Sequence, residues 1–166
     1  MMLPELGQFA LILAVCLSIA LAIVPLIGVQ KGIGGWIALA RPAAFGQLFF
    51  MVVAYAILTT CFLQHDFSVL YVASNSNTHL PTMYLIAGVW GSHEGSLLLW
   101  ALILSIWTAA VALFSKNLPT ELVARVLSVM GAVAVGFSLF IIFTSNPFER
   151  LFPAPLEGRD LNPLLQ

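Results

Sequence analysis

Four long runs without a charged side chain constrain the fold of this chain more than any other feature. The runs cover residues 7–27, 43–63, 97–114 and 126–144, and none contains Asp, Glu, Lys or Arg. A helix of about 20 apolar residues crosses the hydrocarbon core of a bilayer. Only 8% of the residues are charged, against about 25% in soluble domains. We therefore expect an all-α integral membrane protein with about four transmembrane helices.

The basic residues between the runs predict the orientation of the helices. Four of them lie between runs one and two or between runs three and four: Lys31, Arg41, Lys116 and Arg125. The loop 64–96 contains neither Lys nor Arg. Because connections rich in Lys and Arg stay on the cytoplasmic side, we expect both termini, this loop and the tail 145–166 to be periplasmic. This assignment takes the outer side as the periplasm, as it is in a bacterium, where the membrane would be the inner (cytoplasmic) membrane.

The loop and the tail are predicted to be mostly irregular. Residues 64–81 are typical of surface coil, with SNSNT at 74–78 as the most flexible part. Residues 82–90 are apolar but too short to span, which favours a short interfacial helix. The tail holds four prolines and is expected to form an extended strap on the periplasmic side. We expect one membrane domain that is the N-terminal piece of a longer protein.

The cysteines and the net charge exclude some classes of protein. Cys16 and Cys61 stand alone in apolar runs, without a CxxC or CxxCH motif, so we expect two small buried hydrophobes. Their depths in the membrane differ by about 10 Å at a rise of roughly 1.5 Å per residue. A disulfide needs Cα atoms within about 7 Å, so both thiols should be free. A net charge of −1 without a basic cluster predicts no nucleic-acid partner.

The stretch VWGSHEGSLLLW, residues 89–100, places a histidine beside a glutamate between glycines and tryptophans. If residues 88–100 form one helix, small residues gather on one face, and the glycine spacing is typical of close helix packing in a bilayer. That face contains Gly88, Gly91 and Gly95. The opposite face would be free for a planar or polar ligand. It contains Trp90, His93, Glu94 and Trp100.

Simpler interpretations of this stretch stay open. The tryptophans are also typical of the membrane interface. Ser92 would equally serve as the N-cap of the third span, with Glu94 favourable near the positive end of the helix dipole. His65 and His79 are expected to be loop residues. No second ligand accompanies His93 at helical spacing, so the sequence predicts no metal site.

Three segments together resemble a known family. They are HLPTMYLIAGVW at 79–90, VWGSHEGSLLLW at 89–100, and SNPFERLFP with EGRDLNPLLQ in the tail. From the first run to Gln166, the chain resembles the N-terminal part of the CcmF and NrfE family, the haem lyase subunit of cytochrome c biogenesis. The resemblance implies cytochrome c maturation, in which haem is joined to the CxxCH cysteines of apocytochrome c by thioether bonds.

The resemblance also implies a cofactor, partners and a site. The cofactor is haem, with axial histidines expected beyond Gln166 because family members are several times longer. The partners are the haem chaperone CcmE, CcmH with CcmI, and apocytochrome c. Trp90, His93, Glu94 and Trp100 become the candidate wall of the haem or apocytochrome site. We expect no catalytic residue in this chain and no catalysis by it alone.

Two other functions remain as alternatives. The chain is also suited to a non-catalytic membrane scaffold held by its glycine and serine face. A small subunit of a respiratory complex would have a similar length. Ion translocation by such a subunit normally requires ionisable groups within the membrane, and all four runs lack them. This absence counts against the respiratory subunit.

Overall fold

The computed structural model describes residues 2–159, and these form helices without a β-strand. The elements are α1 (Leu3–Lys31), α2 (Gly34–Ala38), α3 (Ala40–Leu63), α4 (Leu70–Asn75), α5 (Thr82–Gly88), α6 (His93–Phe114) and α7 (Thr120–Thr144). The expected all-α fold is confirmed.

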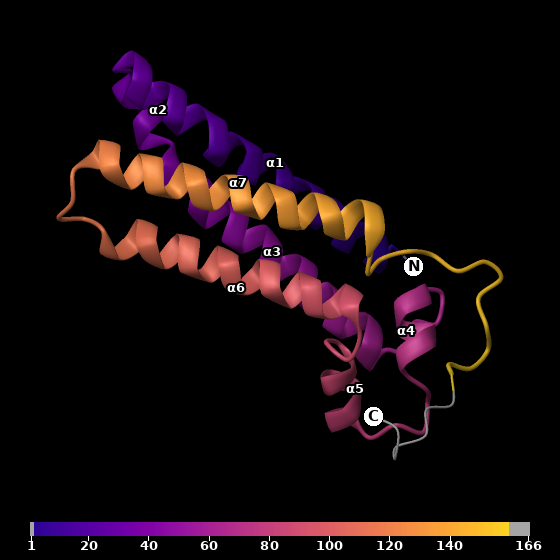
Figure 1. Ribbon diagram of the computed structural model, residues 1–166. Coiled ribbons are helices and arrows are strands. Elements are labelled where there is room, and N and C mark those ends of the chain that lie inside the picture. The colour runs from indigo at the N-terminus through magenta and orange to yellow at the C-terminus, as the bar shows by residue number, and fades with distance from the viewer. Residues whose placement is uncertain (1, 160–166) are drawn as a thin grey trace.

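Four helical segments are long and apolar enough to cross a membrane: Leu3–Lys31, Gly34–Leu63, His93–Phe114 and Thr120–Thr144. The second joins α2 to α3. Helices α1, α3, α6 and α7 run side by side as an elongated bundle (Figure 1). The four expected spans are therefore present, and each begins several residues before the corresponding uncharged run.

Small residues allow the long helices to pack closely. At the end of the bundle near α2, the buried core consists largely of alanines together with Leu21, Val123 and Leu127. Gly131 of α7 lies against α1, where an added Cβ atom would be 2.9 Å from the backbone nitrogen of Ala22. Close approach of this kind is typical of helices in a bilayer, where van der Waals packing drives association.

The other end of the bundle carries α4, α5 and the tail (Figure 1). The prediction of surface coil at 64–81 is wrong for its middle part. Residues Leu70–Asn75 form the short helix α4, which buries Tyr71, Val72 and Ala73, and Val69 and Val72 have no exposed surface. Ser76 and Asn77, within the segment predicted to be most flexible, are buried too. The polar composition of this segment predicted exposure. The Ser76 hydroxyl can be buried because it donates a hydrogen bond of 2.8 Å to the Val72 carbonyl.

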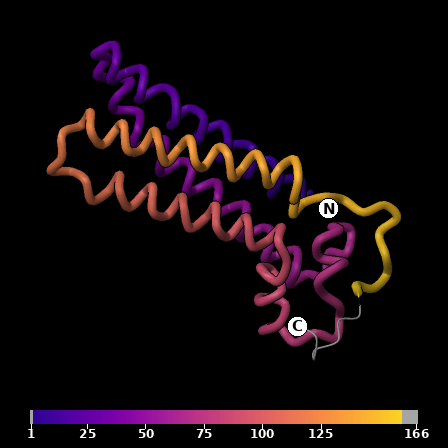
Figure 2. The backbone as a smooth tube through the Cα atoms, viewed as in Figure 1, coloured from indigo at the N-terminus to yellow at the C-terminus, as the bar shows by residue number. Residues whose placement is uncertain are grey.

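The tail is an extended strap attached to this end of the bundle (Figure 2). Phe148 is buried against Gly7 of α1. Arg150 forms an antiparallel bridge with Val69 and an ion pair of 2.6 Å with Glu5. Three backbone hydrogen bonds connect the strap to the segment around α4: Leu70 N–H to Glu149 O, Leu151 N–H to Ser68 O, and Arg159 N–H to Ala73 O. The strap therefore holds α4 in place.

The two cysteines have different surroundings. Both are free thiols, as predicted. Cys61 is fully buried, whereas Cys16 is exposed on the surface of α1. The prediction of burial is wrong for Cys16 because α1 buries the face that contains Ala14, Val15 and Ser18.

Candidate functional site

The stretch 88–100 is not one helix. Helix α5 ends at Gly88, α6 begins at His93, and residues 89–92 form a bend between them. Ser92 is extended, with φ −131° and ψ 177°, and takes the N-cap position of α6 without a capping hydrogen bond from its side chain. The two opposite faces predicted for a continuous helix therefore do not exist.

The three glycines of the predicted packing face do not share one partner helix. A Cβ atom on Gly95 would overlap the carbonyl oxygen of Val89 and lie 2.5 Å from the Tyr71 hydroxyl. At Gly88 it would lie 3.2 Å from the Phe62 ring, and at Gly91 it would lie 3.3 Å from the Gly88 carbonyl. Gly95 thus permits close packing. The two parts that it brings together are the bend 89–92 and the first turn of α6, the helix that contains Gly95.

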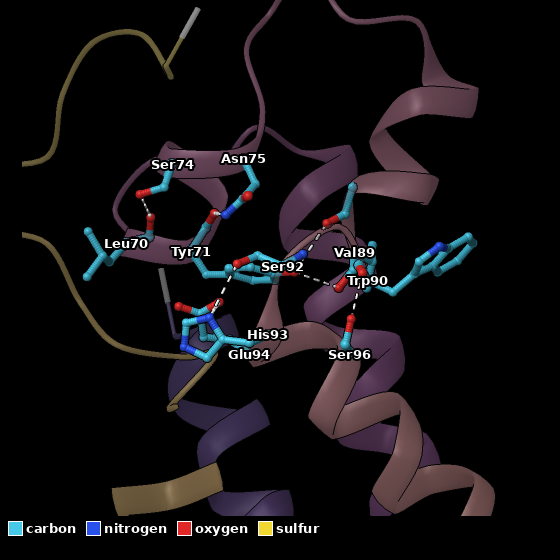
Figure 3. Close-up of polar contacts among 11 residues, drawn as sticks. Leu70, Tyr71, Ser74, Asn75, Val89, Trp90, Ser92, His93, Glu94 and Ser96 are labelled. Atoms are coloured by element: carbon cyan, nitrogen blue, oxygen red, sulfur yellow. Dashed lines mark hydrogen bonds and ion pairs between the residues drawn. The ribbon is translucent and has the colours of Figure 1, made fainter. Parts of the chain in front are cut away.

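Tyr71 of α4 holds the bend (Figure 3). Its hydroxyl donates to the Val89 carbonyl at 3.0 Å and accepts from the Ser92 N–H at 3.3 Å. The ring is 3% exposed and packs edge-on against Phe62 with centroids 5.3 Å apart. Burial raises the pKa of Tyr71 to about 12, so the hydroxyl stays a neutral donor. Tyr71 is not among the site residues predicted from the sequence, although its apolar neighbours indicate burial, and a buried tyrosine usually forms a hydrogen bond.

His93 and Glu94 lie together, whereas Trp90 lies apart from them. The His93 Nδ1 atom is 3.4 Å from Glu94 Oε2 and 3.5 Å from Ser92 Oγ. The Trp90 indole extends away on the opposite side of the bend (Figure 3). Its carbonyl accepts a hydrogen bond of 2.7 Å from Ser96 Oγ. The structure therefore divides the candidate wall between two sides of the bend.

An open groove of about 670 Å³ lies between α6 and α7 at this end of the bundle. Two of the four candidate residues, His93 and Trp100, line it. Across the groove, α7 contributes Phe137 and Phe140, which the sequence analysis did not single out. Trp100 is 65% exposed, so its indole is free to contact a ligand or another apolar surface. The groove combines aromatic walls with one imidazole.

The carboxylate of Glu94 lies in a different environment from the groove. Its Oε2 atom is shielded from solvent and forms no hydrogen bond within residues 2–159. The imidazole of His93 lies near this carboxylate, with Nδ1 3.4 Å from Oε2. This contact directs the Nδ1 side of the His93 ring towards the carboxylate. That arrangement leaves Nε2 of His93 as the nitrogen for a ligand.

The other histidines do not join this site. His65 follows α3 with φ of 52° and lies 5.9 Å from the Phe67 ring. His79 is an exposed residue of the loop between α4 and α5. Within the part of the chain that the structure describes, no three His, Cys, Asp or Glu side chains form a group that would hold a metal ion.

Comparisons with known proteins place the chain in a family. A family model described as cytochrome C assembly protein matches residues 90–166. The cytochrome c-type biogenesis protein CcmF of Pseudomonas aeruginosa is 58% identical over 99% of this chain. CcmF of Escherichia coli is 54% identical, and NrfE of Haemophilus influenzae is 45% identical, each over 99% of the chain.

A solved structure gives the same result. The cytochrome c haem lyase CcmF matches 90% of this chain with a TM-score of 0.84 and 30% sequence identity. The chain spans about a quarter of the length of these relatives: 25% of the P. aeruginosa protein, 26% of the E. coli and H. influenzae proteins, and 25% of the solved chain. This chain belongs to the CcmF family of cytochrome c-type biogenesis proteins.

Proposed function

We propose that the chain acts in cytochrome c maturation, as part of the membrane haem lyase that attaches haem to apocytochrome c. The observation that carries this proposal is the 58% identity to a CcmF protein over 99% of the chain. That similarity includes the stretch 89–100, which forms the bend and the start of α6. An identity this high over nearly every residue supports a shared role for this segment.

The groove between α6 and α7 is the part of this chain best suited to a haem edge. Haem is a planar, largely apolar ring, and the groove offers the rings of Trp100, Phe137 and Phe140 beside the imidazole of His93. Aromatic walls with a few polar groups are typical of small-molecule sites. Trp90 and Glu94 do not line the groove, so we assign Glu94 to restraining His93 and leave Trp90 for a protein contact.

The work of this segment is positioning. Haem supplies the vinyl groups that react with the two thiols of a CxxCH peptide, and the reaction depends on how these groups are held relative to each other. The aromatic side chains of the groove would restrict the orientation of the haem plane, and His93 would lie at the edge of the haem ring. His93 is the one histidine among the residues that line the groove, so two-histidine ligation of iron there would need an imidazole from elsewhere.

We place the chain in the bacterial inner membrane with both termini periplasmic. The basic residues Lys31 and Lys116 lie at the end of the bundle opposite the tail, which supports this orientation by the positive-inside rule. The groove would then open near the periplasmic surface. There it would meet the haem chaperone CcmE, CcmH with CcmI, and apocytochrome c, which we propose as partners.

Complementation of a strain without its own CcmF tests this function. We expect His93→Gln and Glu94→Gln in the full-length protein to lower the yield of haem-stained cytochrome c while immunoblots show normal membrane levels. Glu121→Gln is the matched control, because this exposed carboxylate lies at the opposite end of the bundle, where it forms an ion pair with Arg125. Full maturation by both site variants would contradict the proposed role of this segment.

A further inference from the structure

A second cavity lies at the end of the bundle opposite the candidate site. It has a volume of about 270 Å³ and lies between α2, the start of α3 and the start of α7. Its lining is mainly apolar, with one cation and one hydroxyl group. The residues that matter here are Ile37, Ala38, Arg41, Thr120, Val123 and Ala124.

Arg41 is the cation of this cavity. Its side chain is partly buried, and Nη2 donates to the Ser115 carbonyl at 3.2 Å. That hydrogen bond fixes the guanidinium beside the turn between α6 and α7. A guanidinium has five N–H donors in a planar fork that suits the oxygens of a phosphate. Thr120, at the start of α7, adds a hydroxyl donor to the same cavity.

The surroundings of the cavity match those of a lipid headgroup. Trp36 of the short helix α2 and the two residues that flank the helix, Ile33 and Leu39, are exposed at a spacing of three residues. An exposed tryptophan is typical of the membrane interface. The apolar surface continues on α7, where Leu122 and Val126 are exposed. A headgroup in the cavity would therefore have apolar surface beside it for its acyl chains.

The charge of this end also favours an anion. The connections 28–42 and 115–125 carry four basic residues, named above, and one acid, Glu121, which gives a formal charge of +3. The Glu121 carboxylate lies 3.9 Å from the Arg125 guanidinium. It therefore pairs with Arg125 and not with Arg41. Basic pockets between membrane helices are known to bind the headgroups of anionic lipids.

We propose that this cavity binds one anionic phospholipid. The phosphodiester contacts the guanidinium of Arg41 and the hydroxyl of Thr120, and the acyl chains run along the exposed apolar residues of α2 and α7. The ligand class is a lipid rather than free phosphate, because the walls of the cavity and the adjoining surface are apolar. This site is separate from the groove at the other end of the bundle and does not depend on its function.

Native mass spectrometry of the full-length protein in detergent tests the site. The protein is titrated with phosphatidylglycerol or with phosphatidylcholine of the same acyl chains, and the number of retained lipids is counted. We expect one phosphatidylglycerol to be retained at concentrations where phosphatidylcholine is lost. Excess inorganic phosphate should not displace it. Equal retention of both lipids, or displacement by phosphate, would overturn the proposal.

Three variants locate the lipid. Arg41→Gln removes the charge and should weaken phosphatidylglycerol binding about tenfold or more, as expected for lost hydrogen bonds to a charged group. Ala38→Leu fills the cavity without changing any charge and should have a similar effect. Arg125→Gln is the matched control and should bind as the parent does. Equal losses in Arg41→Gln and Arg125→Gln would show general electrostatic attraction instead and refute the site. If Arg41→Gln does not fold, unchanged binding by Ala38→Leu refutes it.

Discussion

Replacing Gly95 by alanine should destabilise the protein, although alanine is the better helix former. The added methyl group would overlap the Val89 carbonyl and lie 2.5 Å from the Tyr71 hydroxyl. The bend 89–92 would have to move away from α6. That movement would break the hydrogen bond of 3.0 Å between Tyr71 and Val89.

The expected cost follows from three contributions. Overpacking a well-packed site costs about 1–3 kcal/mol. Leaving buried hydrogen-bonding groups without partners costs about 1–3 kcal/mol more. Alanine returns about 1 kcal/mol of helix propensity relative to glycine. The net effect is a loss of about 3 kcal/mol, which for a domain of this size lowers Tm by about 6–12 °C.

The buried thiol of Cys61 provides the assay. Its side chain is fully buried in the core near the bend, so a thiol-reactive dye reports unfolding on heating. Cys16 is exposed and is replaced by serine in the parent. Gly136→Ala is the matched control, because a Cβ atom there has no neighbour within 4 Å. It should leave Tm unchanged or raise it slightly.

Two results would refute this reasoning. If Gly95→Ala melts within about 2 °C of the parent, equivalent to less than about 1 kcal/mol, the bend does not press on α6 as described. If Gly136→Ala lowers Tm as much as Gly95→Ala does, the effect belongs to glycine replacement in general. A larger loss in Gly95→Leu than in Gly95→Ala would be consistent with overpacking.

Three further predictions concern topology, pH and haem. In a background without cysteines, His79→Cys should react with an impermeant maleimide from the periplasmic side and Asn117→Cys should not. The reverse pattern would show that the topology is opposite to the one predicted. Because burial raises the pKa of Tyr71 from 10.0 to about 12, its contribution to stability is complete below pH 10 and falls as pH rises towards 12. Alkaline melting curves of the parent should therefore decline more steeply than those of Tyr71→Phe, and parallel curves would contradict this. The isolated chain should show no stoichiometric bis-histidine haem spectrum, because His65, His79 and His93 do not meet in one site; a strong Soret band of that type would disprove it.

The membrane helices could be predicted from the sequence because their signal is local. An uncharged run of sufficient length has few alternatives in a bilayer, since every backbone group must be satisfied within the helix. The ends of the helices were predicted less accurately than their presence. Glu5 lies inside α1, where Arg150 of the tail pairs with it. A charge at the edge of a run thus marks the end of the apolar segment but not the end of the helix.

The outer segments could not be predicted in the same way because long-range contacts decide them. Residues 74–78 have the composition of a flexible loop, yet Ser76 and Asn77 are buried. Thr78 donates its backbone N–H to Glu157, 79 positions away in the chain. At the bend, Gly91 and Ser92 interrupt a pattern that suits a continuous helix. The hydroxyl of Tyr71 stabilises this interruption, and no local pattern identifies such a partner.

These contacts connect the tail to the candidate site through α4. The tail forms a bridge between Arg150 and Val69, which is immediately followed by α4. Within α4, Tyr71 accepts the backbone N–H of Ser92, the residue before His93. The imidazole is therefore positioned by two elements, the first turn of α6 and the hydroxyl of α4, and the second of these depends on the tail. The glycine at 95 belongs to the same arrangement, because only a residue without a side chain lets Val89 and Tyr71 approach α6 this closely.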